Sequence, residues 1–126
     1  MADIDKVEVY EKESRFYDLD FFDQNGTKIP LASMSALKLS LFLKDSSGPT
    51  FINSRNQQNV LNANNVTVAS PGDIQWAIQP ADLTIQNAAC ENEIHIAVFE
   101  LTTTSTPALI RRKELYLVVD NVEAIS

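Results

Sequence analysis

The chain has 126 residues, of which 44% are hydrophobic and 21% charged, and its formal net charge is −7. This length suits one domain, and the composition is that of an ordinary globular protein rather than of a disordered chain. An acidic surface repels phosphate backbones and the basic run is short (Arg111–Lys113), so no nucleic-acid binding is expected. No run approaches the roughly 18 apolar residues of a membrane helix, so no membrane partner is expected either.

The N-terminal sequence MADIDKVEVYEKE places acidic residues where a secretory signal needs a basic start and then an apolar run. We therefore expect the chain to be made and kept in a cytoplasm until it is assembled or released. Cys90 is the one cysteine, which allows no internal disulfide and suits a reducing compartment. Packing alone is then expected to stabilise the fold, with Cys90 as a small buried residue.

Apolar and polar residues alternate along most of the chain, a period typical of β-strands. In chain order the pattern predicts strands over residues 6–10, 15–23, 36–44, 50–53, 64–68, 74–78, 94–101 and 113–119. The clearest of these is ALKLSLFLK at 36–44, where four leucines share one face. Trp76 shares a face with Ile74 and Ile78, so it is predicted to lie in the core.

Turn-forming residues separate the predicted strands. Asn25-Gly26 supplies the positive φ of a hairpin turn, and Ser70–Asp73 is also typical of a turn. The Asn/Gln-rich residues 53–65 predict a long loop or an irregular edge, and Pro80 suits the first position of a helical turn. Seven to nine short strands predict one all-β domain over residues 1–126, an antiparallel β-sandwich, with a closed barrel as the alternative.

The residue patterns support no catalytic, metal or cofactor site. His95 is the only histidine, and it is five positions from Cys90, so on one strand the two would point to opposite faces. The sequence has no Gly-x-Ser-x-Gly elbow and too few cysteines and histidines for zinc. Aligning Asp23–Gly26 with a calcium loop would place Phe21 and Ala32 at ligand positions, so that motif fails. We expect a non-enzymatic protein.

Three aromatic residues fall on strand faces that are otherwise polar, or oppose the apolar face of their strand. Exposed aromatic residues on an outer sheet face can form subunit contacts, although cover by residues 53–65 is an equal alternative. Amides within 53–65 can hydrogen-bond to a partner's backbone. The candidate interface therefore consists of Phe22, Phe42, Tyr116, Asn56, Gln57 and Gln58.

The order of motifs adds a resemblance. Asp23 and Gly26 precede Ile29-Pro30-Leu31, a strand ends in Lys44-Asp45 before a glycine turn, and Gly72-x-Ile-x-Trp-x-Ile78 precedes Pro80-x-Asp82. This order, over roughly residues 7–120, resembles the immunoglobulin-like domains of tailed-phage virion proteins, such as baseplate upper proteins and head-fibre proteins.

The resemblance implies an immunoglobulin-like antiparallel β-sandwich of about 7–9 strands. It also implies a structural virion protein: a head-decoration, neck or baseplate/fibre-attachment subunit. Such a subunit would be a homo-oligomer or be present in many copies, with other virion proteins and copies of itself as partners. The alternative function is a carbohydrate- or cell-surface-binding module that uses an aromatic platform on one sheet face or the loops at one end.

Overall fold

The structure is a computed structural model that describes residues 4–10, 13–44, 50–85 and 92–120. These residues form nine strands and two short 3-10 helices, η1 (Leu31–Ser33) and η2 (Pro80–Leu83). The strands are β1 (Ile4–Tyr10), β2 (Arg15–Leu19), β3 (Met34–Leu43), β4 (Thr50–Phe51), β5 (Gln58–Asn59), β6 (Val66–Ala69), β7 (Asp73–Ile78), β8 (Asn92–Thr103) and β9 (Ile110–Asp120). None of the described helices is long and apolar enough to cross a membrane.

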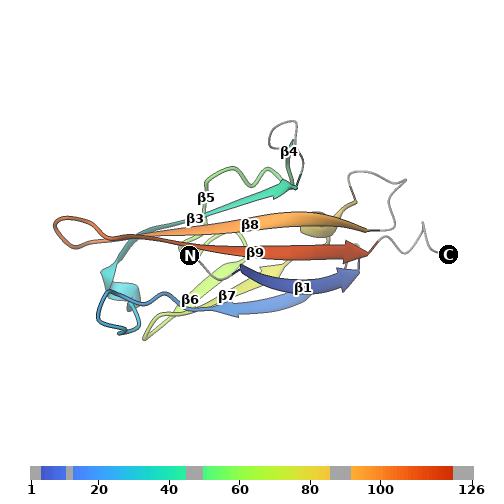
Figure 1. Cartoon of the computed structure of the whole chain (residues 1–126). Helices are drawn as coiled ribbons and strands as arrows, with labels where there is room; N and C mark the ends of the chain where they lie inside the picture. The colour runs from blue at the N-terminus through green and yellow to red at the C-terminus, as the bar shows by residue number, and fades with distance from the viewer. Residues whose placement is uncertain (1–3, 11–12, 45–49, 86–91, 121–126) are drawn as a thin grey trace.

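The strands form two sheets. The larger sheet has the order β1-β9-β8-β3-β4, with β5 also paired to β3, and the smaller sheet has the order β2-β7-β6. Figure 1 shows β3, β8 and β9 of the larger sheet running side by side along the length of the molecule. All pairs are antiparallel except β1 with β9.

The strand order identifies the type of sandwich. Variable-type immunoglobulin domains have nine strands, named A, B, C, C′, C″, D, E, F and G in chain order. Strands B, E and D belong to one sheet, and strands C, F and G belong to the other, with C′ and C″ beside C. Here β2-β7-β6 corresponds to the first set, and β9-β8-β3 with β4 and β5 corresponds to the second. The predicted all-β, immunoglobulin-like sandwich is therefore confirmed.

The core lies between the sheets and follows the alternation of the strands. Leu37, Leu39 and Leu41 of β3 are completely buried, as predicted from their shared face. Trp76 of β7 is also completely buried, and its ring meets Phe99 of β8 edge to face, with 5.5 Å between the ring centroids. The prediction that Trp76 is core is confirmed.

Residues 50–60 run along the outer edge of β3. The backbone N–H of Ile52 donates to the carbonyl of Leu41, and the N–H of Leu41 donates to the carbonyl of Arg55. The prediction of an irregular edge is thus confirmed, and the asparagines have a conformational reason, because Asn tolerates positive φ better than most residues. The non-glycine residues with positive φ are Asn53, Ser54, Gln57, Asn62, Asn64 and Asn65.

Two predicted turn features are also present. Gly26 has a φ of +80°, and the Oδ1 atom of Asp23 accepts hydrogen bonds from the backbone N–H groups of Asn25 and Thr27. Pro80 begins η2, in which Asp82 accepts a hydrogen bond from the backbone N–H of Gln79. Cys90 lies outside the described residues.

Candidate functional site

The outer face of the larger sheet carries a row of apolar side chains. Phe42 of β3 pairs with Phe51 of β4 on one side and with Ile96 of β8 on the other, and Ile96 pairs with Tyr116 of β9. The rings of Phe42 and Phe51 meet edge to face, with 6.1 Å between their centroids. Because paired residues point to the same side of a sheet, these four side chains form a continuous band across four strands.

More apolar side chains flank this row on β8 and β9. Along β8 the residues with odd numbers point into the core, so Ile94 and Val98 point outward with Ile96, and Val118 of β9 pairs with Ile94. The row and its neighbours, here called the outer-face patch, are Phe42, Phe51, Ile94, Ile96, Val98, Tyr116 and Val118. Phe51 is 38% exposed and the others are half-buried. The second sheet packs on the opposite face, so this patch faces solvent.

A hollow of about 270 Å³ lies beside the patch. Phe42, Phe51 and Val98 form its apolar side, and Asn56 and Gln57 belong to its polar lining. Across the hollow the Nε atom of Arg112 lies 2.8 Å from the Oε2 atom of Glu100. The site therefore has an apolar centre with amides and charges of both signs around it.

The structure brings together four of the six residues predicted from the sequence. Phe42, Tyr116, Asn56 and Gln57 all belong to this face or its hollow. Gln58 does not project there, because its Oε1 atom accepts a hydrogen bond from Arg55.

Phe22 lies elsewhere in the fold. It is 50% exposed, in the connection after β2, where it forms an isolated bridge with Lys28. The prediction of a strand over residues 15–23 with Phe22 on its polar face is wrong at this end, because β2 ends at Leu19. Phe22 is therefore separate from the outer-face patch.

Sequence reasoning missed Phe51 and the outward residues of β8. Residues 94–101 are apolar on both faces, a pattern that is typical of a central strand covered on both sides. Instead Ile94, Ile96 and Val98 remain half-buried on an outer face. The sequence did contain a signal for this surface. One strand is apolar on both faces, and the chain has too few residues to form a third layer that would cover the second face.

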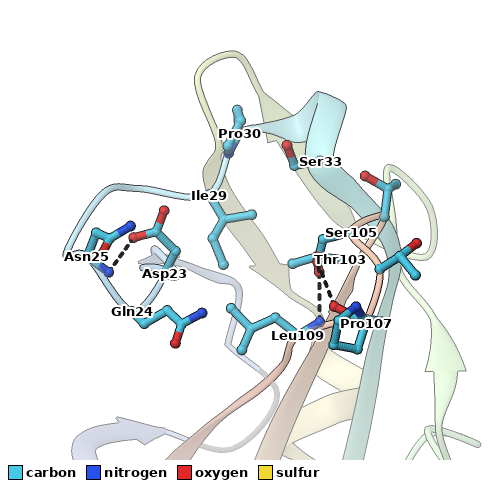
Figure 2. A pocket seen from close by; sticks show the side chains of 13 residues that line it. Asp23, Gln24, Asn25, Ile29, Pro30, Ser33, Thr103, Ser105, Pro107 and Leu109 are labelled. Atoms are coloured by element: carbon cyan, nitrogen blue, oxygen red, sulfur yellow. Dashed lines mark hydrogen bonds between the residues drawn. The ribbon is translucent and has the colours of Figure 1, made fainter.

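A second hollow, of about 500 Å³, lies at the end of the sandwich where the β2–β3 and β8–β9 connections meet. Figure 2 shows Asp23, Gln24 and Asn25 on one side and Ser105 and Pro107 on the other, with Ile29 and Leu109 between them. Hydroxyl, amide and carboxylate groups thus surround an apolar floor. In variable-type domains the corresponding connections form the antigen-binding loops.

The loop of this second hollow is held by its own hydrogen bonds. The Oγ1 atom of Thr103 accepts a hydrogen bond from the backbone N–H of Leu109 at 2.9 Å. It also lies 2.7 Å from the Oγ atom of Ser105, which donates to the carbonyl of Pro107. The hollow is therefore lined by a loop with an ordered shape.

His95 lies in the core, and both nitrogens of its ring contact oxygen atoms. It is completely buried; its Nδ1 atom lies 3.0 Å from the carbonyl oxygen of Asp82 and its Nε2 atom 2.6 Å from the Oε1 atom of Glu93. Both ring nitrogens are thus occupied inside the core. Within the described ranges, no three His, Cys, Asp or Glu side chains are grouped so as to hold a metal ion.

A buried ion pair that the sequence did not reveal joins Arg55 to Asp82. Both side chains are almost fully buried, and the Nε atom of Arg55 lies 2.6 Å from the Oδ1 atom of Asp82. The guanidinium group also lies over the ring of Trp76, 5.8 Å from its centroid. This pair fixes residues 53–65 to η2 and to the core.

Comparisons with known proteins assign the chain to no family. No protein-family model matches the chain, and no curated protein matches it. A solved structure of murine CRIg is similar with a TM-score of 0.46 and 16% sequence identity, over 93% of this chain and 93% of that chain. The chain is classed as an immunoglobulin-like β-sandwich because of its strand order, which does not depend on this comparison.

Proposed function

We propose that the protein is a non-enzymatic structural subunit that binds other proteins through the outer-face patch. The observation that carries this proposal is the band of Phe51, Phe42, Ile96 and Tyr116 across four strands on the solvent-facing side of the larger sheet. Aromatic residues are enriched at protein interfaces, where an apolar centre lies inside a polar rim. A broad sheet face suits contact with another protein surface better than it suits a small ligand.

The rim of the patch supports the same function. Lys38, Glu100 and Arg112 form a cross-strand row of alternating charge on one side, and Glu8 pairs with Val118 on the other. Charges of both signs at a rim select partner and orientation more than they add affinity. The patch is therefore suited to one defined docking geometry.

In its finer form, the proposal is a virion protein of a tailed phage, carried in several copies on the head, neck or baseplate. The order of motifs from Asp23 to Asp82 supports this, as does the small all-β fold. A net charge of −7 keeps free copies apart, whereas a preformed scaffold holds partners at high local concentration. Firm attachment then needs only a moderate contact from each copy.

The experiment uses purified particles of the tailed phage whose genome encodes the chain. Mass spectrometry and immunogold labelling should find the chain in several copies per particle. In a supplementation assay, the double variant Phe42→Ser, Phe51→Ser should attach about tenfold less than the parent chain. The control Phe22→Ser removes an exposed phenylalanine ring from another part of the surface and should attach normally.

The virion function and the attachment surface can each be rejected by a separate outcome. Particles that lack the chain would reject the virion function. A folded double variant that attaches as well as the parent would reject the outer-face patch as the attachment surface.

The second hollow, at the end of the sandwich, favours a second candidate function, a carbohydrate- or cell-surface-binding module. Its hydroxyl and amide groups suit a polyhydroxylated ligand, but none of the described residues that line it has an aromatic ring on which a sugar could stack. A glycan array would decide between the two. Binding that disappears in Asn25→Ala and persists in the double variant of the outer-face patch would favour this second candidate.

A further inference from the structure

The edge strands of the two sheets differ in how they are covered. On β6, the backbone N–H of Val68 donates to the Oδ1 atom of Asn62 at 2.7 Å, so the chain's own side chain caps that edge. The edge of β3 is covered by residues 50–60. An uncovered edge strand readily pairs with another chain, which is why these caps matter.

The edge of β2 has a different character. Within the described parts of the chain, β7 is the only strand paired with β2. Arg15 reaches across to β1, where its Nη1 atom donates to the carbonyl of Glu8 at 2.9 Å, but this contact lies at the start of the strand. Beyond it stands Phe16, which at 67% has the highest exposed fraction among the exposed large hydrophobic residues.

We propose that β2 pairs with β2 of a second copy, antiparallel about a two-fold axis. The two three-stranded sheets would then join into one continuous sheet across the dimer. This arrangement covers the free edge and shields Phe16 at the same time. It depends on β2 alone and therefore stands or falls separately from the proposed attachment surface.

The sequence of β2 selects one register for this pairing. In a continuous sheet, outward residues must lie opposite outward residues, which on this strand are Phe16 and Asp18, with Ser14 just before it. With Phe16 opposite Phe16, the two rings form a cross-strand aromatic pair and Ser14 lies opposite Asp18. This register puts a hydroxyl donor beside each carboxylate and brings no like charges together.

The other registers are poorer. A shift of the two-fold axis by one residue places Phe16 opposite Asp18, and a further shift places Asp18 opposite Asp18. Like charges directly opposite each other destabilise a strand pair. Because the paired edge is short and each copy carries a charge of −7, we expect a weak dimer that is favoured by salt and high concentration.

Disulfide formation tests both the edge and the register. In a Cys90→Ala background, Phe16→Cys places two thiols directly opposite each other, with Cβ atoms about 4.5–5.5 Å apart. Under mild oxidation it should form covalent dimers about tenfold faster than the matched controls Asp18→Cys on β2 and Thr67→Cys on the capped β6 edge. Equal rates for Phe16→Cys and Thr67→Cys would overturn the proposal. Fastest crosslinking of Asp18→Cys would overturn the register.

Sedimentation velocity of the uncrosslinked chain gives an independent result. The parent should show concentration-dependent dimers, and Phe16→Lys should remain monomeric because it opposes two like charges. The double variant of the outer-face patch should dimerise like the parent, which separates this surface from the attachment surface. If Phe16→Lys is folded by its melting curve and still dimerises like the parent, the proposal is wrong.

Discussion

Arg55 and Asp82 form a two-point ion pair in the interior of the sandwich. Nε lies 2.6 Å from Oδ1 and Nη2 lies 3.2 Å from Oδ2, and neither side chain exceeds 1% exposure. The remaining groups are also satisfied: the Arg55 guanidinium donates to Gln58, to the carbonyl of Asn64 and to Asn65. A single arginine thereby determines the path of an otherwise irregular segment.

The first prediction concerns this pair. Asp82→Ala leaves a guanidinium group buried without its counter-charge, so we expect it to lower the free energy of unfolding by about 3–5 kcal/mol. The matched control is Asp73→Ala, which breaks an exposed ion pair with Lys28 and should cost less than about 1 kcal/mol. Urea denaturation measures both. Equal losses would mean that burial of the Arg55–Asp82 pair has no energetic consequence.

The second prediction separates the size of Trp76 from its polar atom. Trp76→Ala should cost about 3–5 kcal/mol, because it opens a cavity in the core. Trp76→Phe should cost much less, since a ring remains to meet Phe99 and the indole Nε1 is removed. That atom is buried without a hydrogen-bond partner among the described residues. Thermal melts of both variants test this, and similar losses would show that the site does not tolerate the smaller ring.

The fold was largely predictable because strand alternation is a local signal. Leu37, Leu39, Leu41 and Trp76 are buried because each shares a strand face with other apolar residues, and such a face is visible within a few positions. The irregular edge was predictable for a similar reason, because runs of asparagine mark backbone that avoids regular structure.

The polar interior was not predictable in this way. Arg55 and Asp82 are 27 positions apart, and only the folded chain brings them together. Arg55 lies among amides that indicate a solvated loop, so its burial has no local signature. The pairing of Glu93 with His95 was within reach, because residues two apart on a strand share a face.

The third prediction concerns the ammonium group of Lys28. A hydrogen bond from Nζ to Asp73, together with the nearby charge of Asp20, raises the pKa of Lys28 above its usual 10.5. A raised pKa in the folded state stabilises the fold fully below pH 10.5, and this contribution is lost as the pH rises through the folded value. An NMR titration of the Lys28 ε-methylene should find the raised pKa.

Replacing Asp73 or Asp20 by asparagine shows which of the two carboxylates raises the pKa of Lys28 more. Asp73→Asn should lower this pKa more than Asp20→Asn, because the Asp20 oxygen lies farther away, at 3.5 Å. A larger effect of Asp20→Asn would contradict the geometry.

The fourth prediction compares two glycines with positive φ. Gly26 has a φ of +80° and open space around it, so Gly26→Ala should cost only the left-handed backbone penalty of about 1–2 kcal/mol. Gly72 has a φ of +128°, and a Cβ atom there would lie 2.2 Å from the carbonyl oxygen of Ile29. That oxygen belongs to the backbone, whose N–H is hydrogen-bonded to Phe21, so it cannot simply rotate away. Gly72→Ala should therefore lower the free energy of unfolding by about 1–3 kcal/mol more than Gly26→Ala does, as measured by urea denaturation. Equal losses would show that the Ile29–Pro30 backbone moves aside freely.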